Sequence, residues 1–167
     1  QLADGIERPE QLLALHFFNP AQVMKLVEVA ATERTAPGVV ETAHAFCEAI
    51  GKRAVEVGPS SGYVVNRLLV PYILHAIETL EQGVADAEAI DEAMKLGCGH
   101  PMGPLALADY IGLDVVFAMA KTMQANLHDH RYRAPSLLRR LVLARHLGKK
   151  SGAGIYDYGG ESPTVNA

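Results

Sequence analysis

The stretch RAVEVGPSSGYVVNRLLVPYIL, residues 53–74, contains the change of pattern that decides the fold. Its first six residues, Arg53–Gly58, are typical of a short strand. The glycine- and serine-rich turn that follows marks a boundary. From Tyr63 to Gln82 the pattern predicts a helix of about 30 Å, apolar nearly all round in its first half and so expected to be buried on most sides. We therefore divide the chain into two domains, residues 1–58 and 59–167.

Residues before the boundary are predicted to form a strand, a second strand, a helix and a third strand. LLALHFF at 12–18 is the first strand, which Pro20 ends because proline cannot donate to a sheet. Met24–Ala30 is the second strand, and Pro37–Ile50 has the spacing of a helix that Thr35 could cap. The apolar face expected on this helix consists of Val39, Ala43, Phe46, Cys47 and Ile50. Three strands and one helix indicate an α/β edge that needs further partners to bury both faces.

Residues after the boundary are predicted to be helical. Further helices are expected at about 87–96, 105–111, 115–126 and 137–147, with Asp86 and Ser136 as caps. The glycine- and lysine-rich turn at 148–158 leads to a short extended end. The predicted fold is therefore an α/β piece followed by an all-α domain.

Composition restricts the classes of function. The 167 residues are 49% hydrophobic and carry a net charge of −4, so no basic patch favours nucleic acid. No apolar stretch is long enough to span a membrane, and no leader sequence is expected. Cys47 and Cys98 form no C-x-x-C pair and are expected to be reduced core residues of an intracellular, cytoplasmic protein.

His16 lies at the end of the first predicted strand, where open α/β sheets bind ligands. A histidine there can act as a base, although its position alone favours a structural histidine bonded to a carbonyl. Glu28 changes the balance, since a carboxylate inside the apolar strand LVEVA needs a partner. Paired strands would set Glu28 beside His16 and give an acid–base pair; the alternative is an edge position facing water.

Asn66 and Arg67 interrupt the most apolar part of the chain. A buried amide must find a partner, so Asn66 is a candidate for ligand binding, or else a polar link between domains. Arg67 fits the structural role better. His128 and His130 form an H-x-H without a third ligand, which favours a solvated helix end over a metal site, and no metal is predicted.

Five blocks of the sequence occur together, in order and at the right spacing: HFFNP (16–20), KLVEV (25–29), GYVVNRLLVPY (62–72), DEAMKLGCGHPMGPLALADYIGLD (91–114) and GKKSGAGIYDY (148–158). Together they resemble the L-3-hydroxyacyl-CoA dehydrogenases, most closely the 3-hydroxybutyryl-CoA dehydrogenases. The resemblance implies the edge of a Rossmann-type NAD-binding sheet, followed by a helical substrate-binding and dimerisation domain like the C-terminal domain of 6-phosphogluconate dehydrogenase.

The resemblance also implies roles for five residues. His16 matches the catalytic histidine that takes the hydroxyl proton, and Glu28 matches the glutamate paired with it. Asn66 matches the asparagine that holds the substrate oxygen. Asn19 and Lys150 match positions that contact NAD near its nicotinamide. The implied reaction is oxidation of an L-3-hydroxyacyl-CoA to the 3-ketoacyl-CoA, in fatty acid or butanoate metabolism.

Three departures from the family pattern qualify this expectation. The family's G-x-G-x-x-G half and a serine upstream of the His16 block are absent, so we expect the chain alone to be inactive. Tyr63 replaces the phenylalanine usual in the family's GF-x-x-NR motif.

The expected partners are an acyl-CoA substrate and a second copy of the chain. Four residues of the long helix, Leu68, Leu69, Tyr72 and Ile73, offer more apolar surface than one small core needs, which favours a homodimer. Two alternatives stay open: a related dehydrogenase of a sugar acid, and a dimerisation module without catalysis.

Overall fold

A computed structural model describes residues 5–160 and 164–165. The chain separates into two compact units, Gln1–Val65 and Asn66–Ala167. The predicted order of strand, strand, helix and strand in the first unit is confirmed. Helices form most of the second unit, as predicted.

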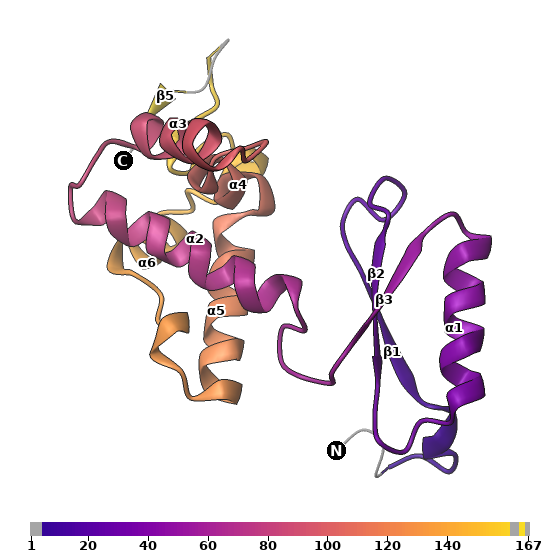
Figure 1. The fold of residues 1–167 in the computed structure, drawn as a ribbon. Coiled ribbons are helices and arrows are strands. Elements are labelled where there is room, and N and C mark those ends of the chain that lie inside the picture. Colours follow the sequence, from indigo (N-terminus) through magenta and orange to yellow (C-terminus); the bar gives the residue numbers. More distant parts are fainter. Residues whose placement is uncertain (1–4, 161–163, 166–167) are drawn as a thin grey trace. The chain divides into compact units, whose positions relative to one another are not determined.

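The first unit is built on a three-stranded sheet in the order β1 (Leu13–Phe17), β2 (Leu26–Ala31) and β3 (Arg53–Val57), after a 3₁₀ turn at Pro9–Gln11. β1 is antiparallel to β2, and β2 is parallel to β3. Helix α1 (Pro37–Ala49) connects the two parallel strands and lies along the sheet (Figure 1). Its contact face is the small core of this unit: Val27, Val29, Ala43 and Cys47, with Leu13, Leu15 and Ala54 beside them.

Side chains alternate between the two faces of a sheet along each strand, and this alternation shows which residues lie on the face opposite α1. His16 lies opposite Glu28, and Glu28 lies opposite Val55, so the three share one face. The neighbouring positions Leu15, Val29 and Glu56 share the other face. The histidine and the glutamate are therefore on the side of the sheet that α1 does not cover.

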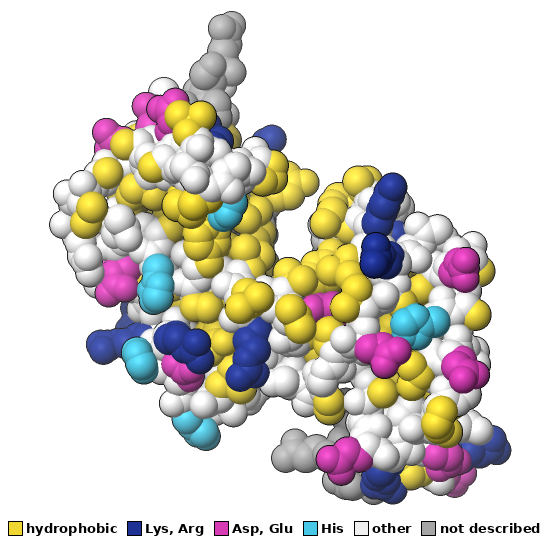
Figure 2. All heavy atoms as spheres, in the orientation of Figure 1, with side chains coloured by type: hydrophobic (Ala, Val, Ile, Leu, Met, Phe, Trp, Pro, Cys, Tyr) yellow, Lys and Arg dark blue, Asp and Glu magenta, His cyan; other side chains and the backbone are white. Residues whose placement is uncertain are grey.

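Two expectations for α1 are wrong. Ala36 occupies its N-cap without a side-chain bond, while the Thr35 hydroxyl donates to the carbonyl of Leu12 at 2.6 Å. Phe46 and Ile50 are 48% and 44% exposed. Three strands are narrow enough that only a thin stripe of the helix reaches the sheet, so hydrophobic side chains remain on the surface of this unit (Figure 2).

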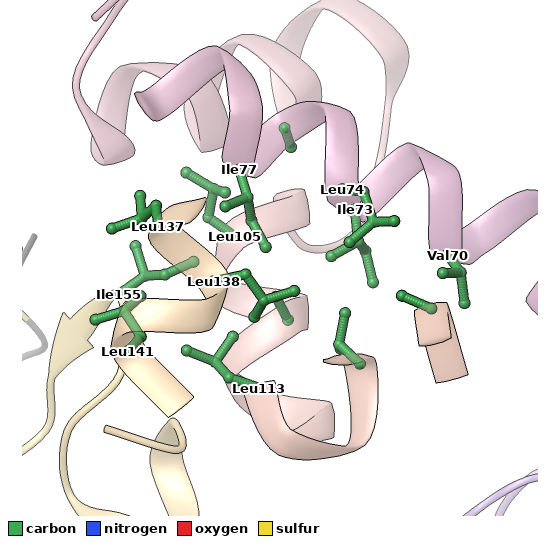
Figure 3. Close-up of a cluster of buried hydrophobic side chains, with 14 of the residues drawn as sticks. Val70, Ile73, Leu74, Ile77, Leu105, Leu113, Leu137, Leu138, Leu141 and Ile155 are labelled. Atoms are coloured by element: carbon green, nitrogen blue, oxygen red, sulfur yellow. The ribbon is translucent and has the colours of Figure 1, made fainter. Parts of the chain in front are cut away.

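The second unit contains α2 (Val65–Glu81), α3 (Ala87–Cys98), α4 (Pro104–Ile111), α5 (Leu113–Leu127) and α6 (Ser136–Leu143). Short 3₁₀ turns at His130–Tyr132 and Lys149–Ser151 and the paired strands β4 (Tyr156–Asp157) and β5 (Thr164–Val165) complete it. Side chains from α2, α4, α5 and α6 and from the segment before β4 meet in one core (Figure 3): Val70, Ile73, Leu74, Ile77, Leu105, Leu113, Leu137, Leu138, Leu141 and Ile155.

Several details of the second unit differ from expectation. Pro135, not Ser136, is the N-cap of α6, and this helix ends at Leu143 because Arg145 has a left-handed φ of 62°. Cys98 is exposed at the end of α3, whereas Cys47 is buried as expected. On α2, Ile73 is fully buried but Leu68 is 69% exposed, so the first half of the long helix is not buried on most sides as expected.

Two buried aspartates that the sequence analysis did not single out organise the second unit. The carboxylate of Asp91 accepts from the backbone N–H groups of Leu105 and Ala106, both at 2.8 Å, and therefore caps α4. Asp109 accepts from the N–H groups of Ile155 and Tyr156 at 3.0 and 2.9 Å. These bonds hold the start of β4 in place.

No helix within the described residues is long and apolar enough to cross a membrane.

Candidate active site

The His16–Glu28 pair is formed directly by the register of β1 and β2. The two residues are opposite each other in the antiparallel ladder. His16 Nδ1 and Glu28 Oε2 are 2.7 Å apart. The side chain of Glu28 is 1% exposed, whereas that of His16 is 27% exposed. A buried carboxylate thus holds an imidazole that solvent and ligands can reach.

Glu28 is also bonded through its other oxygen. Oε1 accepts from the backbone N–H groups of Val64 and Val65 at 3.0 and 2.9 Å. These donors, together with the imidazole, compensate the burial of the charged form of Glu28. An ionised carboxylate only accepts hydrogen bonds, so Nδ1 carries the proton and donates it. In neutral His16, Nε2 is therefore the nitrogen available to take a proton.

Two aromatic rings contact the imidazole. The ring centroid of Phe18 is 4.6 Å from that of His16, and the centroid of Tyr63 is 5.2 Å away. Both distances are in the range of favourable ring contacts. Neither ring was predicted to contact the imidazole; such contacts between distant segments become visible only in the folded chain.

Asn19 and Asn66 offer side-chain amides in different settings. Asn19 is exposed, two residues beyond the end of β1. Asn66 is partly buried in the first turn of α2. Neither side chain makes a hydrogen bond to a residue that the structure describes, so both amides can bind a ligand.

Lys150 already has a partner. Its ammonium donates to Asp114 Oδ1 at 2.5 Å, which joins the turn at Lys149–Ser151 to the first turn of α5. The bond from Lys150 lowers the pKa of the Asp114 carboxyl. The two side chains are 46% and 39% exposed, so this ion pair lies at the surface.

The histidines of the H-x-H sequence do not form a cluster with other metal-binding side chains. His128 ends α5 with a left-handed φ of 52°, and the His130 side chain is 95% exposed. Among the residues that the structure describes, no group of three or more His, Cys, Asp or Glu side chains could hold a metal ion.

Sequence comparison finds two family models on the chain. The "3-hydroxyacyl-CoA dehydrogenase, NAD binding domain" matches residues 1–60, and the "3-hydroxyacyl-CoA dehydrogenase, C-terminal domain" matches residues 62–158. A Bacillus subtilis protein named "Probable 3-hydroxybutyryl-CoA dehydrogenase" is 50% identical over 162 residues, which are 95% of this chain and 55% of that protein. The 3-hydroxybutyryl-CoA dehydrogenase of Clostridioides difficile is 46% identical over 95% of this chain and 56% of its own length.

Solved structures agree with the sequence matches. The (S)-3-hydroxybutyryl-CoA dehydrogenase of Ralstonia eutropha superimposes with a TM-score of 0.90 at 43% identity, covering 95% of this chain and 56% of that chain. The 3-hydroxybutyryl-CoA dehydrogenase of Escherichia coli K12 gives a TM-score of 0.92 at 42% identity, with 98% and 35% covered. The chain thus spans about half the length of the curated relatives that it matches.

The sheet that carries the histidine–carboxylate pair matches the model of an NAD-binding domain, and the helical unit matches a second domain model, so the class is that of two-domain, NAD-binding proteins. Within that class, the chain belongs to the 3-hydroxyacyl-CoA dehydrogenase family. The predicted fold class and family are confirmed.

Proposed function

We propose that this chain carries the acid–base site of an NAD-dependent enzyme that oxidises an L-3-hydroxyacyl-CoA to the 3-ketoacyl-CoA, with 3-hydroxybutyryl-CoA as its substrate. The observation that carries the proposal is the 2.7 Å contact between His16 Nδ1 and the buried Glu28 carboxylate. The relatives named 3-hydroxybutyryl-CoA dehydrogenase support the choice of substrate.

The proton chemistry follows from the orientation of the imidazole. Oxidation of an alcohol removes a hydride from carbon and a proton from oxygen. Nε2 of His16 takes the proton, because Nδ1 is already engaged by Glu28. The carboxylate then stabilises the imidazolium that forms and keeps the ring in one tautomer. In the reverse reaction the same imidazolium returns the proton.

Bound NAD would supply the chemistry of a hydride acceptor. Asn19 fits the nicotinamide end, since its exposed amide can bond a carboxamide and it follows the strand that carries His16. Lys150 is proposed for the same end of the cofactor, with its ammonium held by Asp114. The 167 residues contain no G-x-G-x-x-G sequence, so they do not supply the glycine-rich cradle for the pyrophosphate.

Asn66 is proposed to hold the substrate oxygen. Its amide can donate to a carbonyl or hydroxyl oxygen, and no described residue bonds it. The division of labour that we propose assigns cofactor binding to residues 1–58, and substrate binding and dimerisation to residues 59–167.

We also propose a homodimer formed through the helical unit in the cytoplasm. Exposed Leu68 and Val84, at 69% and 70%, support an apolar contact with a second copy. Val84 lines a groove of about 360 Å³ whose other walls are mostly apolar side chains, including Ala76, Ile90 and Met94. Cys47 and Cys98 are both free thiols, which fits a reducing compartment.

The test is NAD-dependent oxidation of (S)-3-hydroxybutyryl-CoA by the complete product of the gene. We expect His16→Gln to lower kcat by about 10²–10⁴-fold, as is usual for loss of a general base. His130→Gln is the matched control, because this side chain is 95% exposed and lies outside the site. Equal kcat values for His16→Gln and the unmodified enzyme would refute the role of His16.

A second arm of the experiment tests the substrate and the extent of the active unit. We expect turnover with 3-hydroxybutyryl-CoA and none with sugar acids; the reverse would favour the sugar-acid alternative. The 167-residue chain assayed alone should not turn over, since it has no glycine-rich dinucleotide loop.

A further inference from the structure

The turn that precedes α2 has an unusual backbone at Tyr63. Gly62 has a φ of 79°, and Tyr63 follows with a φ of 46°. The left-handed region is open to glycine but disfavoured for a residue with a Cβ atom. Residues held in such a conformation need support from their surroundings and concentrate at functional sites.

Glu28 provides much of that support. The Tyr63 N–H donates to the carbonyl of Ser60 at 3.0 Å, which closes the turn. The next two N–H groups, those of Val64 and Val65, both donate to Glu28 Oε1. The carboxylate that orients His16 therefore also fixes the backbone immediately after Tyr63.

The result is an aromatic ring in contact with the imidazole. The ring planes of Tyr63 and His16 are inclined by 36°, with their centroids 5.2 Å apart. The Tyr63 hydroxyl makes no hydrogen bond to any residue that the structure describes. The contact with His16 thus involves the ring and not the hydroxyl.

We propose that Tyr63 is a positioning residue for His16, acting through its aromatic ring; this inference rests on the proposed role of His16 as the base. Glu28 fixes Nδ1 but leaves the imidazole able to tilt about that bond. The ring of Tyr63 restrains this tilt from a segment that the same carboxylate holds. Proton transfer depends on such placement, because small displacements of a catalytic group cost rate steeply.

The experiment compares Tyr63→Leu with Tyr63→Phe in the complete gene product. Tyr63→Leu removes the ring, and we expect kcat to fall about 10–100-fold, as for a misplaced catalytic group. KM should change little, and the pH dependence of kcat should shift. Tyr63→Phe keeps the ring and should retain most of the activity. Tyr110→Leu is the matched control, since Tyr110 is 54% exposed on α4.

A further variant separates positioning from folding. Tyr63→Gly removes the ring and suits the positive φ, so the turn should persist while kcat falls as in Tyr63→Leu. The NMR titration of the His16 imidazole provides a readout independent of turnover, and it should move in the leucine and glycine variants but not in the phenylalanine variant.

The outcomes distinguish the two proposals. Wild-type kcat and pH dependence in Tyr63→Gly would overturn the role of Tyr63, as would an equal loss in Tyr63→Phe and Tyr63→Leu. His16→Gln is measured in parallel. Full activity of that variant would overturn the proposed function itself, whereas an inactive His16→Gln beside a fully active Tyr63→Leu would overturn only the inference about Tyr63.

Discussion

Glu28 in the first unit and Asp109 in the second are similar carboxylates with different third partners. They are 1% and 0% exposed, and each accepts two backbone N–H bonds. The further donor to Glu28 is the partly exposed His16. The further donor to Asp109 is the hydroxyl of Tyr158, at 3.1 Å.

The third partner decides what each carboxylate can do. An imidazole has a second nitrogen that can take up and return a proton, so the partner of Glu28 can take part in acid–base chemistry. The Tyr158 hydroxyl keeps its proton, because burial and the neighbouring Asp109 raise its pKa well above the usual range. Burial also raises the pKa of Asp109, against the lowering effect of its hydrogen bonds. A buried carboxylate alone therefore does not indicate an active site. A buried carboxylate bonded to a group that can exchange a proton does.

The substitution Glu28→Gln should give the largest of the expected effects, and the quantity that it lowers should be kcat. The amide can still accept from Val64 and Val65, but its NH₂ group would face Nδ1 and favour the tautomer with the proton on Nε2. We expect kcat to fall by about 10²–10⁴-fold, measured as NADH formation by the complete gene product. Glu56→Gln is the control, since Glu56 lies on the same sheet but 66% exposed. A Glu28→Gln enzyme with normal kcat would show that Glu28, like Asp109, has only a structural role.

Asp109→Asn should act on stability and leave the chemistry of His16 untouched. The carboxylate accepts three hydrogen bonds, and an amide offers one oxygen in place of two. At least one buried donor would lose its acceptor, which costs about 1–3 kcal/mol of unfolding free energy. Urea unfolding measures it, with exposed Glu92→Gln as the control. An unchanged unfolding free energy would show that these bonds do not hold the C-terminal segment.

Asp114→Asn extends the comparison to a carboxylate at the surface and should give the smallest effect. Lys150 lowers the pKa of Asp114 from its ordinary 3.8, so the pair stabilises the fold above that pH and the contribution is lost as the pH falls through the lowered folded-state pKa. Both side chains are more than a third exposed, so we expect only about 0.2–1 kcal/mol at neutral pH.

The measurement is urea unfolding of the Asp114→Asn and unmodified proteins from neutral to strongly acidic pH. The difference between the two should shrink in acid. A difference that stays constant down to strongly acidic pH would rule out the ion pair as its source.

The sequence predicted the elements and the His16–Glu28 pair because both leave local marks. Alternation and helical spacing set the elements, and a lone glutamate in an apolar strand had to be bonded. The roles of Asp91 and Asp109 left no such mark, since their donors are backbone groups and tyrosines up to 65 residues away. The predicted helix caps Thr35 and Ser136 were wrong for a related reason. The Thr35 hydroxyl bonds the distant carbonyl of Leu12 instead, and α6 begins one residue earlier than predicted, with Pro135 as its N-cap.

The two oxygens of Glu28 give this side chain two separate roles. One oxygen serves the base, and the other serves the backbone of residues 64 and 65. A substitution of Glu28 therefore changes both the proton transfer by His16 and the backbone of the turn before α2. Selection for one of these properties also acts on the other. Laboratory evolution toward a different base at residue 16 would have to redesign residues 63–65 together with residue 28.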